Sequence, residues 1–187
     1  RDRHDGVPVR CTQNATAGEE WRRGWHPERF TKASQPDNVL VVGGGPAGLE
    51  AALIAAKQGF EVTIAEQTDD WGGRVLQESQ LPGMATWRRV RDYRVWALSQ
   101  MGNVSMYANS ELDAEAALSF GADHIAVATG ARWTKRLYSA LEIPAEPLDL
   151  PQILTPEDVF AGTISGDRVL VFDYDNYYLG GVIAEHL

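Results

Sequence analysis

The sequence has a single cysteine, Cys11, among its 187 residues, so it can form no internal disulfide bond. This usage fits a reducing compartment, and we expect a cytoplasmic protein. No run of eighteen apolar residues occurs, so we expect neither a membrane-spanning helix nor a membrane partner. No apolar segment follows the first residues, Arg1 to Asp5, as a secretion signal would require, and the missing initiator methionine predicts a fragment or processed product.

Basic residues are scarce relative to acidic ones, and the formal net charge is −9. A surface of this sign repels phosphates, so we expect no nucleic-acid partner. The charge is uneven, because residues 1–36 hold seven of the 17 Lys and Arg but only five of the 26 Asp and Glu. Together with the turn-forming residues at 34–37, this shift predicts a boundary near Pro36.

The chain also lacks the patterns of a self-contained hydrolase or metal enzyme. Its four histidines show no metal-ligand spacing, no Gly-x-Ser-x-Gly turn occurs, and Cys11 has no evident base partner. We therefore expect no catalytic residue in this chain. The basic run at 88–91 falls on a predicted helix, and we interpret it as a solvated face with local acidic partners rather than a docking site.

What the sequence does contain is a β-α-β unit in under thirty residues. An apolar run at 39–42 predicts a buried parallel strand, and a glycine-rich turn follows at 43–48. The Ala-rich segment 49–58 predicts a helix that Gly59 ends, and residues 61–66 predict a second strand. This order predicts an α/β fold with a parallel sheet.

Further elements are predicted along the rest of the chain. Helices are expected from Thr86 to about Met101, at 113–120, from Thr155-Pro156 onward and at 180–187. Strands are expected at 104–108, 124–128 and 169–172, and loops at 67–83 and at 137–154, where three prolines fall.

Gly43, Gly45 and Gly48 are spaced as Gly-x-Gly-x-x-Gly between the first strand and the first helix. The first glycine lets the chain turn out of the strand, the second lets a pyrophosphate approach the backbone, and the third lets the helix pack against the strand. The helix N-terminus, where Pro46 suits the first turn, offers free N–H groups and a partial positive charge to phosphates.

Glu66 lies eighteen residues beyond Gly48, at the end of the second predicted strand. A carboxylate at this place can accept hydrogen bonds from both ribose hydroxyls of an adenine nucleotide, and it would repel a 2′-phosphate. The motif therefore predicts a site for ADP, FAD or NAD rather than NADP. Its strand–turn–helix context distinguishes it from a glycine-rich turn without a ligand.

Gly72-Gly73-Arg74 after the acidic strand and Ala128-Thr129-Gly130 after a later one extend the pattern. Together with the fingerprint they resemble the Rossmann-like FAD-binding domain of the glutathione-reductase type. The resemblance implies that residues 109–112 lie near the adenine and that the Thr-Gly pair approaches the nucleotide. The residues expected to contact the cofactor are Gly43, Gly45, Pro46, Ala47, Gly48, Glu66, Gln67, Gly73, Arg74, Thr129 and Gly130.

The arm at 10–30, rich in Trp and Arg, resembles the junction segment of trimethylamine dehydrogenase and of the related dimethylamine and histamine dehydrogenases. Tyr93 within Arg91-Asp92-Tyr93-Arg94 and the run Gly130-Ala131-Arg132-Trp133 resemble the same family. The likeness extends from about Arg10 to the end of the chain, and the arm is its most specific part.

The resemblance implies that the chain is a C-terminal fragment of an iron–sulfur flavoprotein. In that family a TIM barrel with covalent FMN oxidises the amine, four cysteines hold a [4Fe-4S] cluster, and electrons pass to an electron-transfer flavoprotein. The next domain resembles an FAD domain and holds ADP, and a smaller NAD(P)H-type module is inserted in it. Cys11 matches the last cluster cysteine, a role it could have only in the parent protein, because one thiolate cannot hold four irons.

The implied domains are the arm at 1–36, an incomplete nucleotide-binding domain at 37–166, and the start of the inserted module at 167–187. In that module, residues 172–181 stand where a second phosphate turn would lie, but the fingerprint glycines are missing. Aspartates, among them Asp173, would repel a pyrophosphate there. This departure favours the amine dehydrogenases over the NADPH-dependent dienoyl-CoA reductases.

Three functions remain open at this stage. The first is the ADP-binding (or FAD-binding) portion of an FMN and [4Fe-4S] amine dehydrogenase, inert by itself because the barrel lies elsewhere. The second is a non-catalytic module in which ADP is a permanent folding ligand that shapes the domain for partner docking. The third is a fragment of an FAD- and NAD(P)H-dependent enoyl-CoA-type reductase.

Overall fold

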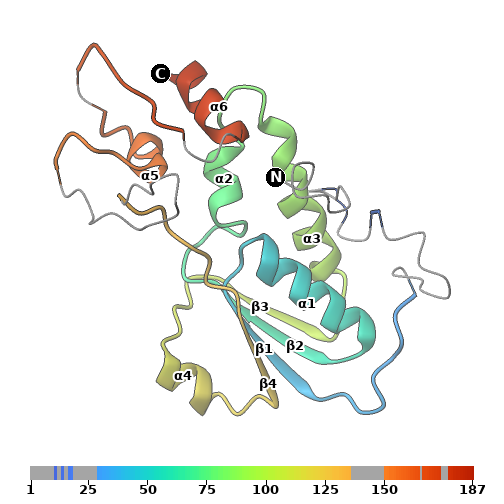
Figure 1. The fold of residues 1–187 in the computed structure, drawn as a ribbon. Helices are drawn as coiled ribbons and strands as arrows, with labels where there is room; N and C mark the ends of the chain where they lie inside the picture. Colours follow the sequence, from blue (N-terminus) through green and yellow to red (C-terminus); the bar gives the residue numbers. More distant parts are fainter. Residues whose placement is uncertain are drawn as a thin grey trace. The chain divides into compact units, whose positions relative to one another are not determined.

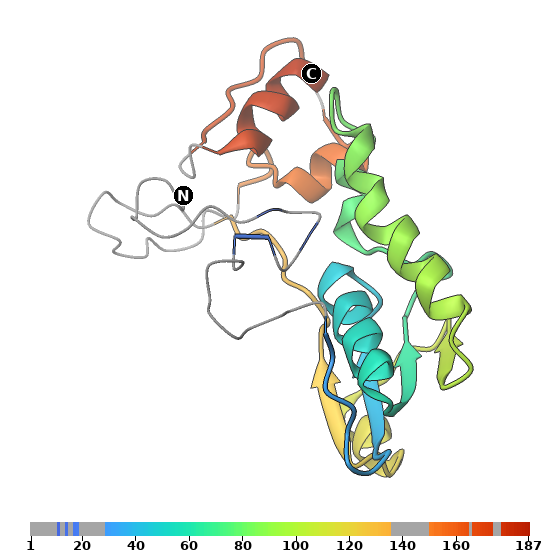
Figure 2. The same ribbon diagram turned by 90° about the vertical axis from the view of Figure 1, so that its right-hand side faces the viewer.

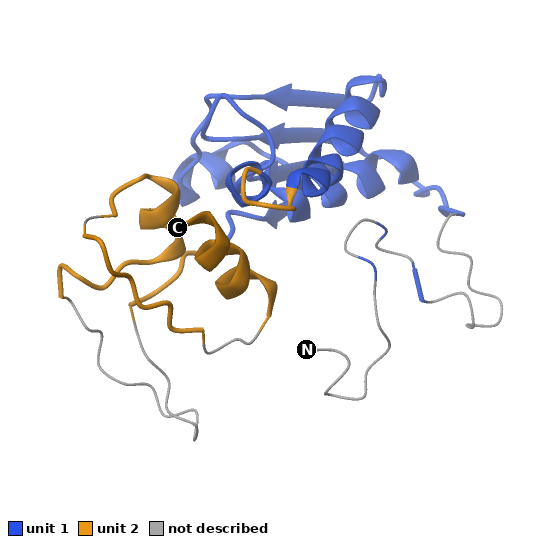
Figure 3. Ribbon diagram, turned by 90° about the horizontal axis from the view of Figure 1, so that it is seen from above, with its two compact units in different colours: residues 1–79, 85–130 blue, residues 80–84, 131–187 orange. Residues whose placement is uncertain are grey.

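The computed structural model describes residues 29–135, 150–164, 166–173 and 177–187, together with Cys11, Asn14, Ala17 and Gly18. The chain divides into two compact units, residues 1–79 with 85–130 and residues 80–84 with 131–187 (Figure 3). Most of the arm, most of the predicted loop at 137–154 and Asp175 lie outside the described residues. The domain boundaries expected after residues 36 and 166 stay predictions.

The first unit is built on a four-stranded sheet in the order β3-β2-β1-β4 (Figure 1). The central strand β1 (Asn38–Val42) pairs in parallel with β2 (Glu61–Ala65) on one side and with β4 (His124–Val127) on the other. The strand β3 (Val104–Tyr107) pairs in parallel with β2. The predicted fold class, α/β with a parallel sheet, is confirmed.

Helices cover both faces of this sheet (Figures 1 and 2). On one face α1 (Pro46–Gln58) and α3 (Arg89–Ser99) share a core with β1 and β2. Its least exposed side chains, at 2% or below, are Val41, Leu49, Ala52, Leu53, Ile64 and Leu98. On the other face α4 (Ala114–Ser119) packs Ala117 against Leu40 and Val42. Covering on both faces explains why β1 is a continuous apolar run.

The ends of the helices follow from local sequence. α1 begins at Pro46, and it ends at Gly59, whose φ of 100° allows its N–H to donate to the carbonyls of Ala55 and Ala56. The N-terminus of α4 is capped by Asp113, whose side chain accepts a hydrogen bond from the Ala116 N–H. The sequence predicted a helix at 49–58 that Gly59 ends and a helix at 113–120, and α1 begins three residues earlier than expected, at Pro46.

Two predictions in the first unit are wrong in part. The segment at 67–83, expected to be a loop, contains α2 (Arg74–Glu78), and five residues are too few for a helical period to be recognised. The helix expected from Thr86 to about Met101 is instead a 3₁₀ turn, η1 (Ala85–Arg88), followed by α3. Thr86 therefore lies inside the 3₁₀ turn and is not the cap of α3.

The second unit contains α5 (Pro156–Phe160) and α6 (Tyr178–His186), close to the predicted helix positions. The strand predicted at 169–172 is wrong, because these residues are described and form no strand. A strand needs a hydrogen-bonded neighbour, none of the described residues pairs with this segment, and Leu170 is 91% exposed. Among the residues described, no helix has the length and apolar character to cross a membrane.

Candidate functional site

The residues expected to contact a cofactor gather at the carboxyl edge of the sheet, where β1, β2 and β4 end. The turn at 43–48 leaves β1, Glu66 follows β2, and Thr129 with Gly130 lies just beyond β4. The Gly43 N–H donates to the Ala65 carbonyl at 2.8 Å, and the Ala128 N–H donates to the Val42 carbonyl at 2.8 Å. In open parallel sheets, ligands bind in the crevice outside this edge.

Two of the fingerprint glycines are required by the packing of the protein itself. A Cβ atom on Gly43 would collide with the carbonyl of Ala128, and its φ of +107° is one that residues with a side chain rarely adopt. A Cβ atom on Gly48 would collide with the carbonyl oxygen of Gly43. These close approaches hold the start of α1 against the ends of β1 and β4, so both positions have a structural reason to be glycine.

The packing of the protein does not require a glycine at position 45. A Cβ atom on it would have no heavy atom within 4 Å, and its φ of −71° is open to any residue. Gly73, with a φ of +53°, faces Gly45 from the loop after β2, and a Cβ on Gly73 would lie 3.3 Å from the Gly45 Cα. Two residues without side chains therefore border an open space at the beginning of α1.

The N-terminus of α1 lies beside Gly45 and has free backbone N–H groups. No side chain caps this end of the helix, and its first turn contains no acidic residue. Pro46 occupies the first helical position and Ala47, which follows it, is exposed. The uncapped N–H groups and the positive end of the helix dipole suit a phosphate group at this place.

Glu66 is only 6% exposed, and its carboxylate has protein partners. Oε2 accepts a hydrogen bond of 2.6 Å from the Gly44 N–H. Oε1 accepts hydrogen bonds of 2.9 Å from both the N–H and the hydroxyl of Thr68. A buried carboxylate requires such donors. Glu66 therefore links the glycine-rich turn to the loop after β2.

The loop after β3 is joined to the same loop. The Asn109 N–H donates to the Thr68 carbonyl at 3.0 Å, and the Ser110 N–H donates to the Glu66 carbonyl at 2.8 Å. Asn109 has a φ of +50°, the one positive φ of a residue other than glycine in the described part of the chain. The segment expected near the adenine thus lies directly beside Glu66.

Trp71 and Thr68 are site residues that sequence reasoning missed. The Trp71 indole lies over Gly44, where a Cβ atom would come within 2.5 Å of the ring carbon Cε3. The Gly72 N–H donates to the Gly44 carbonyl at 2.9 Å. An aromatic residue directly before a Gly-Gly pair was the available signal for this wall of the site.

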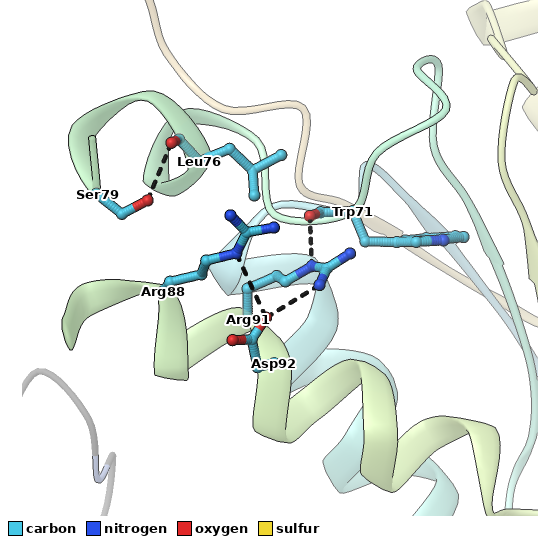
Figure 4. A network of polar contacts seen from close by, with 6 residues as sticks. All are labelled: Trp71, Leu76, Ser79, Arg88, Arg91 and Asp92. Atoms are coloured by element: carbon cyan, nitrogen blue, oxygen red, sulfur yellow. Dashed lines mark hydrogen bonds and ion pairs between the residues drawn. The ribbon is translucent and has the colours of Figure 1, made fainter. Parts of the chain in front are cut away.

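Arg91 of α3 is hydrogen-bonded to the backbone of the loop that carries Trp71 (Figure 4). Its Nε donates to the Trp71 carbonyl at 2.9 Å, and its Nη1 donates to the Asp92 carboxylate at 2.9 Å. Arg88 Nε lies 3.9 Å from the same carboxylate. Asp92 is the local acidic partner expected for the basic run at 88–91, but only Arg88 is solvated as expected, because the Arg91 side chain is 21% exposed and that of Arg88 is 56% exposed.

The remaining predicted residues lie around the same edge or are exposed. The Thr129 Cα would be 3.2 Å from a Cβ on Gly43, and Gly130 follows with a φ of +80°. Gln67 is exposed, and Arg74 Nε lies 3.9 Å from Glu78 Oε1.

A metal ion finds no comparable site among the residues that the structure describes. Cys11 is exposed, and it is the one cysteine of the chain. Within the described residues, no group of three or more His, Cys, Asp and Glu side chains could hold a metal ion. Cys11 by itself therefore provides no metal centre in this chain.

The second unit contains the segment at 172–181, for which the sequence predicted that no second phosphate-binding turn forms. A Cβ atom on Gly180, in the first turn of α6, would lie 2.6 Å from the carboxyl group of Asp173. The Asp173 carboxylate therefore lies at the N-terminal turn of this helix. An acidic group at this position competes with any phosphate for the positive end of the helix.

Comparison with known proteins identifies the family. A family model described as pyridine nucleotide-disulphide oxidoreductase matches residues 9–149. The chain is 39% identical over 191 residues to dimethylamine dehydrogenase of Hyphomicrobium sp. (strain x), covering 96% of this chain and 26% of that protein.

Two solved structures are closer still in sequence. The 6-hydroxypseudooxynicotine amine oxidase of Pseudomonas geniculata N1 is 46% identical with a TM-score of 0.89, over 100% of this chain and 28% of that one. Histamine dehydrogenase of Rhizobium sp. 4-9 is 46% identical with a TM-score of 0.86, over 97% and 29%. The chain thus spans between 26% and 29% of the length of these relatives. It belongs to the pyridine nucleotide-disulphide oxidoreductase family and, within it, groups with the trimethylamine, dimethylamine and histamine dehydrogenases, as its sequence predicted.

Proposed function

We propose that this chain is the ADP-binding portion of an FMN and [4Fe-4S] amine dehydrogenase. The relatives named above act on amines according to their names, which supports this substrate class for the parent protein. On this proposal the barrel with FMN lies in another part of the parent, Cys11 is the last cluster ligand there, and electrons leave to an electron-transfer flavoprotein. The fragment alone is inactive and resides in the cytoplasm.

The observation that carries the proposal is the open space at Gly45. Gly43 and Gly48 are glycine because the protein packs against them, whereas no protein atom lies where a Gly45 side chain would be. Gly102 is equally open, so what distinguishes Gly45 is its place at the carboxyl edge of the sheet, directly before the first turn of α1. The adjacent uncapped N-terminus of α1 supports a diphosphate as that group.

The residues of the site have distinct parts in this binding. The N–H groups at Ala47 and Gly48 would receive the diphosphate, whose negative charge the helix dipole stabilises. Glu66 would accept a hydrogen bond from the ribose, and the segment at 109–112 would border the adenine. FAD could use the same half of the site, since its ADP moiety is identical.

The proposal also includes the organisation of the chain: an arm at 1–36, the nucleotide-binding domain at 37–166, and the start of an inserted module at 167–187. The Asp173 carboxylate at the first turn of α6 supports a module that binds no pyridine nucleotide. This favours an amine dehydrogenase over an NADPH-dependent reductase.

A matched pair of glycine variants tests the proposal. Gly45→Ala places a methyl group in the open space, and Gly102→Ala does so at another position where a Cβ would have no heavy atom within 4 Å. By calorimetric titration with ADP, Gly45→Ala should lose about tenfold or more in affinity, because the methyl group blocks the pyrophosphate. Gly102→Ala should bind ADP like the wild type, and both variants should keep the wild-type melting temperature.

Either of two results would overturn the proposal. One is a wild-type chain that does not bind ADP, and the other is a Gly45→Ala variant that binds ADP as tightly as Gly102→Ala. A third titration tests the part assigned to Glu66: ADP should bind more tightly than 2′-phospho-ADP, because the carboxylate repels the added phosphate. Equal affinity for the two nucleotides would contradict that part.

A further inference from the structure

The partners of Glu66 limit how it can recognise a ribose. A carboxylate offers about four lone-pair positions to hydrogen-bond donors. Three are used within the protein, two on Oε1 by Thr68 and one on Oε2 by the Gly44 N–H. One position remains, on Oε2, whereas a ribose bound through both of its hydroxyls would need two.

The first Thr68 donor, its N–H, cannot leave Oε1 without moving the loop. That loop is held by the loop after β3, because Asn109 donates to the Thr68 carbonyl and Ser110 donates to the Glu66 carbonyl. The backbone on both sides of the Thr68 N–H is therefore anchored, and this hydrogen bond persists when a ligand arrives.

The second Thr68 donor, its hydroxyl, has one proton and two acceptors in reach. Glu66 Oε1 lies at 2.9 Å and the Asp70 carbonyl oxygen at 3.0 Å. Hydrogen bonds to an ionised group are about twice as strong as those between neutral groups. The proton therefore goes to the Glu66 carboxylate, and Oε1 has both of its positions filled.

We propose that Thr68 is a positioning residue that determines how this site reads ribose: it fills Oε1, so that Glu66 recognises one ribose hydroxyl through Oε2 and not both. The ligand is an adenine nucleotide in which only one of the two ribose hydroxyls, the one that reaches Glu66 Oε2, has to be free. The inference rests on the proposed function, since it requires an adenine nucleotide with its ribose at Glu66.

The test compares ADP with 2′-deoxy-ADP and 3′-deoxy-ADP by calorimetric titration of the full chain. In the wild type, one analogue should bind about tenfold or more weakly than ADP, as the loss of a hydrogen bond to a charged group predicts. The other analogue should bind within about twofold of ADP, because its missing hydroxyl has no acceptor on Glu66.

Two variants separate positioning from a merely structural effect. Thr68→Val keeps the branched shape and the N–H but removes the hydroxyl, which opens a position on Oε1. Both analogues should then bind more weakly than ADP by comparable factors. Thr68→Ser keeps the hydroxyl and should restore the wild-type pattern, in which one analogue is distinguished from the other.

The outcomes distinguish this inference from the proposed function. If the wild type loses affinity equally for both analogues, or for neither, or if Thr68→Val keeps the wild-type pattern, the inference is wrong while ADP binding stands. If the wild type does not bind ADP, the proposed function fails and the inference with it. The comparison in the wild type needs no variant, so a Thr68→Val chain that failed to fold would still leave the claim open to refutation.

Discussion

Arg94 of α3 and Glu50 of α1 form an ion pair in which Arg94 Nε lies 2.6 Å from Glu50 Oε2. The Arg94 side chain is 7% exposed and that of Glu50 is 28% exposed. A second guanidinium nitrogen of Arg94 donates to the Val90 carbonyl at 2.8 Å. The pair therefore joins the two helices that cover one face of the sheet, and α1 is the helix whose first turn borders the candidate site.

Replacing Arg94 with alanine should lower the free energy of unfolding by about 1–3 kcal/mol, because Glu50 loses a charged partner in a half-buried place. Urea denaturation measures this difference. Arg89→Ala, at an exposed position of the same helix, is the control and should change stability by less than about 0.5 kcal/mol. A loss for Arg94→Ala no greater than that of the control would contradict the role given to the pair.

Glu66→Gln should destabilise the chain even without a nucleotide. Both carboxylate oxygens accept hydrogen bonds from Gly44 and Thr68, so the amide group of glutamine must turn its NH₂ toward at least one of these donors. We expect a loss of about 1–3 kcal/mol in the free energy of unfolding, the cost of an unsatisfied buried donor. Glu61→Gln, at the exposed start of β2, the strand that Glu66 follows, should be neutral. If thermal unfolding showed the two variants to be equally stable, the structural role assigned to Glu66 would be contradicted.

Gly48→Ala should impair folding rather than binding alone. Its Cβ would overlap the carbonyl oxygen of Gly43, and backbone atoms cannot move aside as the end of a side chain can. We expect a loss of about 3 kcal/mol or more, as for other severe overpacking. Circular dichroism during heating should show a clear drop in melting temperature relative to Gly45→Ala. Equal melting temperatures for the two variants would contradict the division of the glycines into packed and open positions.

The start of α5 should respond to acid. The N–H of Thr155 and then its hydroxyl donate to the Asp158 carboxylate, and they hold the pKa of this carboxyl below its ordinary value of 3.8. Because the folded pKa is the lower one, the stabilisation is complete above 3.8 and is lost as the pH falls through the folded pKa.

An NMR titration of the Asp158 carboxyl carbon checks this directly. Its midpoint should lie below 3.8, and Thr155→Ala should move the midpoint upward by removing the hydroxyl while keeping the backbone donor. A wild-type midpoint at or above 3.8, or no movement in the variant, would contradict the capping arrangement.

Local pattern predicted the elements whose signals lie within a few consecutive residues. β1 is recognisable because a strand covered on both faces must be apolar throughout, and α1 because Pro46 and Gly59 mark its ends. The candidate site could be predicted from the sequence for the same reason, since the fingerprint turn and Glu66 are spaced along one β-α-β unit. Thr68 and Trp71 were not, because their parts depend on what the folded loop places beside them.

The sequence by itself determined the α/β class and the glycine-rich turn at 43–48, since both depend on spacing and periodicity along the chain, and it indicated the family through its resemblance to the amine dehydrogenases. Only the tertiary structure decided which glycines are packed and which is open, because that depends on atoms of Ala128 and of the loop after β2. It also decided against a strand at 169–172, since an apolar segment becomes a strand only when a neighbour supplies the hydrogen bonds.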